Sequence, residues 1–237
     1  LLRSSDPSQR AMNTSKPTPA MPPSSAPAGA DASLRVACWL LETEAEGPGR
    51  RAAVWLQGCP LRCEGCCNPE MLPFEGGETW APEALARELL SGARERGVRG
   101  MSLLGGEPFA QAPAAAALAQ AVRRGGLSVM VFSGYTLAAL TRQAAKGRPG
   151  VAALLEATDV LVDGPYVAGQ PEGSGGRRWV GSRNQRVHHL SDRYAVDDPR
   201  FSHQNSVELR LARDGSLIIN GWPGGAEAVF AEKEAGS

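Results

Sequence analysis

Compact apolar segments alternate with segments of helical periodicity through the middle of the chain. The apolar runs predict buried strands over 34–41, 52–56, 100–104, 127–132 and 160–162. Between them, apolar residues recur every three or four positions, which predicts helices over 79–96, 111–124, 137–145 and 149–157. Thr79 is expected to cap the first helix, Gly97 to end it, and Pro149 to occupy the first turn of the last. This alternation is typical of an α/β fold with a parallel sheet and right-handed crossovers.

The two ends of the chain and its last third follow other patterns. Residues 1–33 are rich in Ser, Pro and Ala without periodicity, which predicts a disordered tail before a domain over 34–223. A short strand is expected over 187–190, and the alternation on both sides of Asp214-Gly215 predicts a β-hairpin of 207–212 and 216–220. Residues 224–237 are expected to form a loose tail.

The first residue is Leu, so Met12 and Met21 are candidate starting residues, and an unusual first codon is the other reading. A dispensable extension is the favoured interpretation of the tail. Its basic residues are too sparse to favour a transit peptide.

Unusual loops follow four of the predicted strands. They are Leu56–Pro69, which holds four of the five cysteines, then Gly105–Pro108, Ser133–Tyr135 and Asp163–Tyr166. Because parallel strands bring their carboxyl ends to one edge of the sheet, the fold should gather these loops on one rim.

Composition narrows the function classes. The chain has 25 basic and 25 acidic residues, and this neutrality argues against a nucleic-acid backbone or an anionic membrane as partner. No apolar run approaches the roughly 18 residues of a membrane span, and no apolar signal-peptide core is present. Crowded cysteines are more typical of a metal or redox site in a reducing cytoplasm than of a secreted disulfide framework.

The cysteine loop has the spacing Cys-x3-Cys-x2-Cys at Cys59, Cys63 and Cys66, and Cys67 follows directly. A structural zinc ion requires four ligands, and adjacent cysteines rarely share one ion. A [4Fe–4S] cluster held by three cysteines instead leaves one iron open for a substrate, whereas most clusters have four thiolates. The spacing therefore favours a cluster over zinc and leaves both open.

The loop Gly105-Gly106-Glu107-Pro108 has a composition suited to ligand binding. Two glycines let the backbone approach a ligand closely and adopt positive φ. A carboxylate beside bare backbone suits the ammonium group of an amino-acid-like ligand. A tight turn with a solvated Glu107 is the alternative.

Together these two motifs resemble those of the radical S-adenosylmethionine superfamily. The resemblance implies that Cys59, Cys63 and Cys66 hold a [4Fe–4S] cluster and that Gly105, Gly106, Glu107 and Pro108 bind S-adenosylmethionine. It also implies that the reduced cluster cleaves the sulfonium to a 5′-deoxyadenosyl radical.

A narrower resemblance is to the activating enzymes of anaerobic ribonucleoside-triphosphate reductases. It rests on Gly65 before the third cysteine and on Asn68 after it, although Cys67 stands where that family usually has an aromatic residue. The agreement extends over roughly Ala52–Leu190. It includes the stretches 132–136, 159–166 and 181–186, where Arg183 replaces a commoner small residue.

Several residues have open roles. Cys67 is expected to be an unligated thiol, with service as a substitute ligand for Cys66 as the alternative. Asp163 and Tyr166 either line the cofactor or cap local backbone. Cys38, inside the first strand, is expected to be buried. His188 and His189 should point to opposite faces of a strand, so neither they nor His203 suggests a metal site.

We therefore expect an open, partial (βα) TIM-like barrel with a parallel sheet and a C-terminal β-hairpin. We expect a cytoplasmic oxidoreductase that generates a glycyl radical on an anaerobic ribonucleoside-triphosphate reductase, with flavodoxin or ferredoxin as electron donor. Asn68, Ser133, Tyr135 and Asp163 are further candidate cofactor-binding residues. The alternatives are an activator of pyruvate formate-lyase or another glycyl-radical enzyme, a radical enzyme acting on a small molecule, and a non-catalytic zinc or electron-transfer module.

Overall fold

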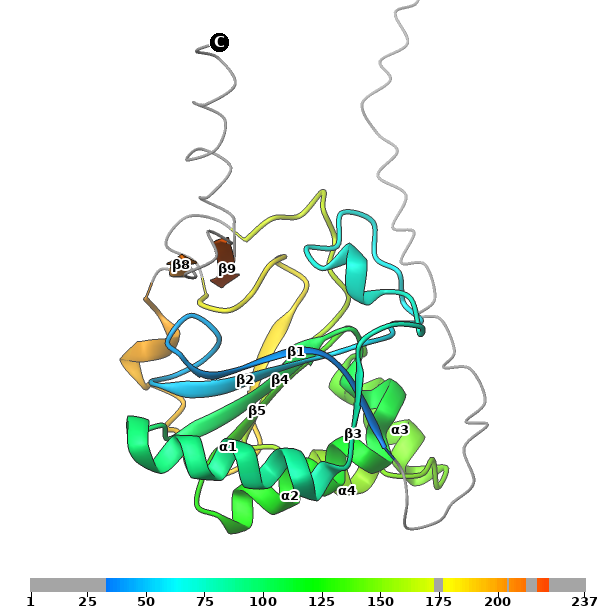
Figure 1. Ribbon diagram of the computed structural model, residues 1–237. Helices are drawn as coiled ribbons and strands as arrows, with labels where there is room; N and C mark the ends of the chain where they lie inside the picture. Colours follow the sequence, from blue (N-terminus) through cyan, green and yellow to red (C-terminus); the bar gives the residue numbers. More distant parts are fainter. Residues whose placement is uncertain (1–32, 173–176, 204, 212–216, 222–237) are drawn as a thin grey trace, which may run out of the picture.

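The computed structural model describes residues 33–172, 177–203, 205–211 and 217–221, and its centre is a seven-stranded sheet (Figure 1). The strands are β1 (Leu34–Thr43), β2 (Arg51–Leu56), β3 (Glu78–Trp80), β4 (Gly100–Gly105), β5 (Ser128–Ser133), β6 (Val160–Asp163) and β7 (Arg186–His189). They lie in the order β3-β1-β2-β4-β5-β6-β7. Strands β2, β4, β5 and β6 pair in parallel, whereas β1, β3 and β7 pair antiparallel to their neighbours. The predicted parallel sheet is thus confirmed as the core of a mixed sheet.

The four α-helices of the described residues cover one face of the sheet, below it in Figure 1. They are α1 (Pro82–Arg96), α2 (Ala112–Arg124), α3 (Leu137–Ala145) and α4 (Val151–Ala157). The hairpin of β8 (Val207–Leu211) and β9 (Leu217–Gly221) lies on the other side. Helices on one face of an incomplete parallel sheet give the expected partial barrel with its C-terminal hairpin.

Alternation along the strands divides the core between the two faces. On β2, Val54 and Leu56 pack among the helices, whereas Ala53 and Trp55 face the opposite side. The helix-side core is larger and includes fully buried leucines from α1, α2, α3 and α4. Among the described residues, no helix combines the length and apolar character needed to cross a membrane.

Three local predictions are wrong. Thr79 lies in β3, and α1 begins after it, with Ala81 at the cap position and Pro82 in the first turn. Pro149 precedes α4, which begins at Val151. Cys38 is exposed because the register of β1 against β2 shifts between Val36 and Cys38, which interrupts the alternation of faces. The predicted tails over 1–33 and 224–237 lie outside the described residues except for Ser33.

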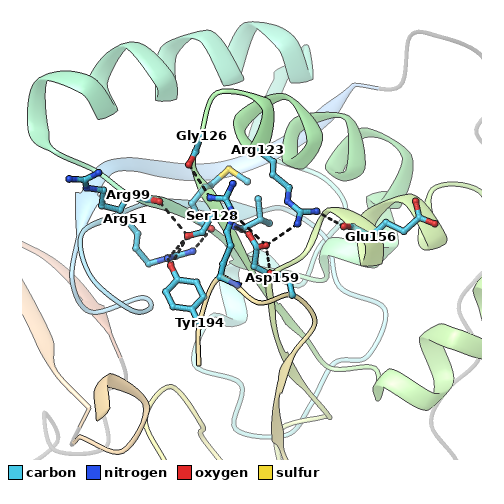
Figure 2. Close-up of polar contacts among 12 residues, drawn as sticks. Arg51, Arg99, Arg123, Gly126, Ser128, Glu156, Asp159 and Tyr194 are labelled. Atoms are coloured by element: carbon cyan, nitrogen blue, oxygen red, sulfur yellow. Dashed lines mark hydrogen bonds and ion pairs between the residues drawn. The ribbon is translucent and has the colours of Figure 1, made fainter. Parts of the chain in front are cut away.

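A buried arginine, Arg51, lies at the edge of the sheet where the parallel strands begin (Figure 2). Arg51 is fully buried and donates hydrogen bonds to Ser102 Oγ (2.9 Å), Ser128 Oγ (3.1 Å), Tyr194 Oη (2.9 Å) and the Met101 carbonyl (2.8 Å). Burial lowers the pKa of the guanidinium. Serving several acceptors at once stabilises the positive charge inside the protein.

Asp159, directly before β6, lies at the same edge of the sheet (Figure 2). Its fully buried carboxylate accepts hydrogen bonds from the Val129 N–H (2.8 Å) and Ser191 Oγ (2.6 Å), and lies 3.1 Å from Arg123 Nη2. Arg51 and Asp159 both have protein partners, which indicates a structural role. The unusual loops lie at the opposite, carboxyl edge.

Candidate functional site

The four unusual loops are joined side by side by hydrogen bonds at the carboxyl edge, as expected. The Gly106 N–H donates to the Leu56 carbonyl (2.7 Å) and the Glu107 N–H to the Gly58 carbonyl (2.9 Å), which joins the β4 loop to the cysteine loop. The next two junctions are Gly134 N–H to Glu107 Oε2 (2.9 Å) and Gly164 N–H to the Tyr135 carbonyl (3.3 Å). These hydrogen bonds join the four loops into one continuous rim at the carboxyl edge of the sheet.

The cysteine loop folds back on its own base. The Cys59 N–H donates to the Leu72 carbonyl (3.1 Å), and the Cys66 N–H donates to the Cys63 carbonyl (3.3 Å). Gln57 Nε2 donates to the carbonyls of Glu70 (3.0 Å) and Pro73 (2.8 Å). Sequence reasoning missed this role of Gln57, although its position between β2 and the first cysteine was a signal.

The four thiols of this loop differ in environment. Cys59 is buried, Cys63 and Cys66 are half-buried, and Cys67 is exposed. Burial, followed by the nearby Glu107, raises the pKa of Cys59 to about 11, although backbone N–H groups oppose this. A hydrogen bond between Cys66 and Cys67 lowers the pKa of Cys66 and raises that of Cys67.

The donor set fits an iron–sulfur cluster. Burial raises the pKa of Cys59 and Cys63, and backbone N–H groups beside the sulfurs of Cys59, Cys63 and Cys66 act in the opposite direction, toward the thiolate form that ligates iron. No three His, Cys, Asp or Glu side chains in the described parts of the chain are grouped as ligands of one metal ion. The cysteines of a cluster bind different irons, so a cluster does not need that convergence.

The glycines of the loop that follows β4 allow this loop and the cysteine loop to lie in close contact. A Cβ on Gly106 would lie 2.3 Å from the Gly58 carbonyl oxygen, and Gly105 has a φ of +94°. Sequence reasoning attributed these glycines to approach of a ligand. In the structure they let the β4 loop lie directly against the base of the cysteine loop.

Glu107 is fully buried and joins the β4 loop to the β5 loop. Its carboxylate accepts hydrogen bonds from the Phe109 N–H (2.9 Å), Ser133 Oγ (3.0 Å) and the Gly134 N–H (2.9 Å). Burial raises its pKa to about 7, and the three donors oppose that shift. The solvated-glutamate alternative is therefore wrong, and the side chain braces the rim. Pro108 is buried beside it and opens a 3-10 turn over Pro108–Gln111.

The other predicted residues lie on the same rim. Ser133 and Tyr135 are buried, and the Tyr135 hydroxyl has no hydrogen-bond partner among the described residues. Burial raises the pKa of Tyr135. Asn68 is half-buried and begins the 3-10 turn Pro69–Met71 after the last cysteine. The orphaned hydroxyl is a polar group that a bound ligand could satisfy.

Asp163 points toward the helices. Its Oδ2 accepts from the Leu137 N–H at the start of α3 (2.5 Å) and lies 3.0 Å from His188 Nε2. His189 faces the other side of β7, where its ring packs 4.8 Å from that of Phe201, so the predicted opposite faces are confirmed. Sequence reasoning missed the Asp163–His188 contact because 25 positions separate the two residues.

An apolar floor on the helix-free face was also missed. Trp55 from β2 and Leu104 from β4 are buried there, and Phe132 from β5 packs against them. All three residues stand one position before their strands end, next to the rim. The alternation of side chains along β2, β4 and β5 was the available signal. These apolar and aromatic side chains exclude water from one side of the rim.

Residues 45–188 match the protein-family model described as a 4Fe-4S single cluster domain, and this match spans more than half of the chain. All four loops lie inside it. The chain belongs to the radical S-adenosylmethionine family of glycyl-radical-enzyme activases. The cofactors of this family are a [4Fe–4S] cluster and S-adenosylmethionine, and its members are enzymes.

Relatives with assigned names agree with this membership. The anaerobic ribonucleoside-triphosphate reductase-activating protein of Vibrio cholerae is 32% identical over 152 residues, which cover 61% of this chain and 91% of the relative. The protein of the same name from Escherichia coli is 29% identical, with the same coverage of both chains. The pyruvate formate-lyase-activating enzyme of Clostridium pasteurianum is 38% identical, but over only 28% of this chain and 29% of its own length.

Proposed function

We propose that this activase generates the glycyl radical of an anaerobic ribonucleoside-triphosphate reductase. One observation carries the proposal: the Glu107 N–H donates to the Gly58 carbonyl (2.9 Å), directly before Cys59. This contact places the two motifs of the superfamily side by side. The match to the Vibrio cholerae activating protein, which spans 91% of that protein, supports the choice of partner.

In this proposal Cys59, Cys63 and Cys66 are the cluster ligands, and Gly105–Pro108 binds the methionine part of S-adenosylmethionine through its main chain. When bound, the cluster supplies the electron that cleaves the sulfonium. Asn68 and Tyr135 are proposed to contact the cofactor directly. Asn68 follows the cysteines directly, and the buried Tyr135 hydroxyl lacks a described partner.

Ser133 and Asp163 are proposed to act on the cofactor site by holding its loops. Ser133 fixes Glu107, and Asp163 fixes the start of α3. The apolar floor of Trp55, Leu104 and Phe132 limits water beside the rim, which protects a reactive radical from side reactions.

The electron donor proposed is a flavodoxin or ferredoxin, and the proposed compartment is the reducing cytoplasm. The partner has a glycine that must reach the rim. The helices cover only one face of the sheet, so the partner is proposed to approach from outside the helical layer (Figure 1).

The first test is anaerobic reconstitution with iron and sulfide, followed by dithionite and S-adenosylmethionine. We expect 5′-deoxyadenosine, and iron bound per chain should fall strongly in Cys59→Ala, Cys63→Ala and Cys66→Ala. Cys38→Ala is the matched control because Cys38 is an exposed cysteine on β1 and is not part of the cysteine loop. Metal uptake without 5′-deoxyadenosine would refute radical chemistry.

A second test separates the candidate partners. The reconstituted protein is mixed in parallel with an anaerobic ribonucleoside-triphosphate reductase and with pyruvate formate-lyase, and the glycyl-radical doublet is recorded by electron paramagnetic resonance. We expect the doublet with the reductase. A signal only with the lyase, or cleavage without either signal, would overturn the proposed partner.

A further inference from the structure

The segment Gly181–Gln185 was singled out in the sequence but has no part in the chemistry proposed above. In the structure it lies against the loop that follows β6. Asn184 Nδ2 donates to the Pro165 carbonyl (2.7 Å), and Gln185 Nε2 donates to the Gly164 carbonyl (2.9 Å). Two side-chain amides therefore hold consecutive carbonyls of the β6 loop.

The rest of the segment strengthens this attachment. Ser182 is fully buried, and its Oγ accepts from the Val167 N–H (3.1 Å). The Arg183 N–H donates to the Gln170 carbonyl (2.8 Å). Gln185 Oε1 accepts from the N–H groups of Gly181 (2.9 Å) and Ser182 (3.1 Å), which fixes the amide orientation. We call Ser182, Asn184 and Gln185 the clamp.

The clamped loop in turn packs on the cysteine loop. A Cβ placed on Gly65 would lie 3.4 Å from Tyr166 Cε1 and 3.3 Å from Ala168 Cβ. Burial raises the pKa of Cys63, and a backbone hydrogen bond from Tyr166 opposes that rise. The β6 loop thus covers one side of Gly65, which lies between the second and third cysteines and is otherwise exposed.

Such a cover has consequences for a cluster. Hydrogen bonds to ligand sulfurs and exclusion of solvent both tune an iron–sulfur centre, and residues behind the ligands determine how firmly the metal is held. The position of the cover depends on polar contacts rather than on a helix or strand. Its order should therefore depend on the clamp.

We propose that Ser182, Asn184 and Gln185 are positioning residues that hold Tyr166 over the cysteine loop and so shield the cluster from solvent. This inference rests on the proposed function, because it requires Cys59, Cys63 and Cys66 to hold the cluster. The shielding acts through the ring and the backbone N–H of Tyr166. The clamp residues act on the cluster only through the loop that carries Tyr166.

The test measures iron release from the reconstituted full chain to an excess of chelator, followed anaerobically by the loss of cluster absorbance. Gln185→Ala and Tyr166→Ala should release iron about 10-fold faster than the wild type, the usual scale for loss of a residue behind the metal ligands. Tyr166→Phe keeps the ring and the backbone N–H and should release iron at the wild-type rate.

Asn205→Ala is the matched control. Asn205 lies after β7, outside the clamp, and its Oδ1 accepts from the Trp179 N–H (2.6 Å) on the connection between β6 and β7. Its variant should release iron at the wild-type rate. Gln185→Glu is a second variant, for use if Gln185→Ala does not fold. It keeps an acceptor for the N–H groups of Gly181 and Ser182 but lacks the donor to the Gly164 carbonyl, so it should also release iron faster.

Wild-type release rates in both Gln185→Glu and Tyr166→Ala would overturn the proposal. Equal acceleration in Asn205→Ala would also overturn it, because general loosening of the fold would then explain the effect. A wild-type chain that takes up no cluster would instead refute the proposed function, so the two failures are distinguishable.

Discussion

The buried carboxylate of Glu107, on the rim, should make the free energy of unfolding depend on pH, and this can be tested. Replacement by Gln keeps the shape of the side chain but removes its ability to ionise. In the folded chain burial raises the Glu107 pKa from its ordinary 4.5 to about 7. Between these pH values the folded chain keeps a proton that the unfolded chain has released. Stability should therefore fall as pH rises through this window.

The size of the effect follows from the two pKa values. The full window corresponds to about 3 kcal/mol of unfolding free energy, of which about 1.3 kcal/mol is lost between pH 6 and pH 8. Glu46 is nearly buried, and its pKa is also raised to about 7, first by burial. It should contribute a similar loss over the same interval. The wild type should thus be about 2.6 kcal/mol less stable at pH 8 from the two groups together.

The assay is urea unfolding of the metal-free chain under reductant at pH 6 and pH 8. Glu107→Gln should reduce the loss between pH 6 and pH 8 by about 1.3 kcal/mol, and Glu46→Gln, the matched control, should reduce it by a similar amount. At either pH Glu107→Gln also leaves one of the three donors without an acceptor. That defect costs about 1–3 kcal/mol, because the amide offers a single oxygen.

A pH dependence in Glu107→Gln equal to that of the wild type would refute this reasoning. It would mean that the three donors keep the carboxylate ionised throughout the interval despite burial. If only Glu46→Gln removed the loss of stability, the whole pH effect would come from Glu46.

Three further predictions concern other parts of the structure. Arg51→Ala should lower the unfolding free energy by about 3–5 kcal/mol in urea, because buried acceptors lose their donor; a loss below about 1 kcal/mol would contradict the network in Figure 2. Gly106→Ala should cost about 1–3 kcal/mol and lower the iron bound per chain, because its Cβ would meet the Gly58 carbonyl at 2.3 Å, whereas Gly169→Ala meets nothing within 4 Å and should be neutral. Leu118→Ala in the helix-side core should cost about 2–5 kcal/mol by thermal or urea unfolding, while Leu211→Ala, 77% exposed, should stay within about 0.5 kcal/mol.

Much of the fold was predictable because helices and buried strands leave a periodic record along the chain. Helix α3 has the predicted bounds, Leu137–Ala145, and the parallel strands β2, β4, β5 and β6 lie within two residues of their predicted ends. The antiparallel placement of β1 was not predicted, although a signal existed. Only seven residues separate β1 from β2, fewer than the dozen or so that a parallel crossover requires.

The sequence by itself determined the order of the loops and the spacing of Cys59, Cys63 and Cys66, since both are properties of neighbouring residues. Tertiary structure decided where individual side chains point. Glu107 turns inward because its three donors include Ser133 on β5, 26 positions further along the chain, and Cys38 turns outward because β1 shifts register. Likewise, the clamp meets the β6 loop across a connection whose described residues form no helix or strand. Such contacts depend on distant residues and on register, which local periodicity does not record.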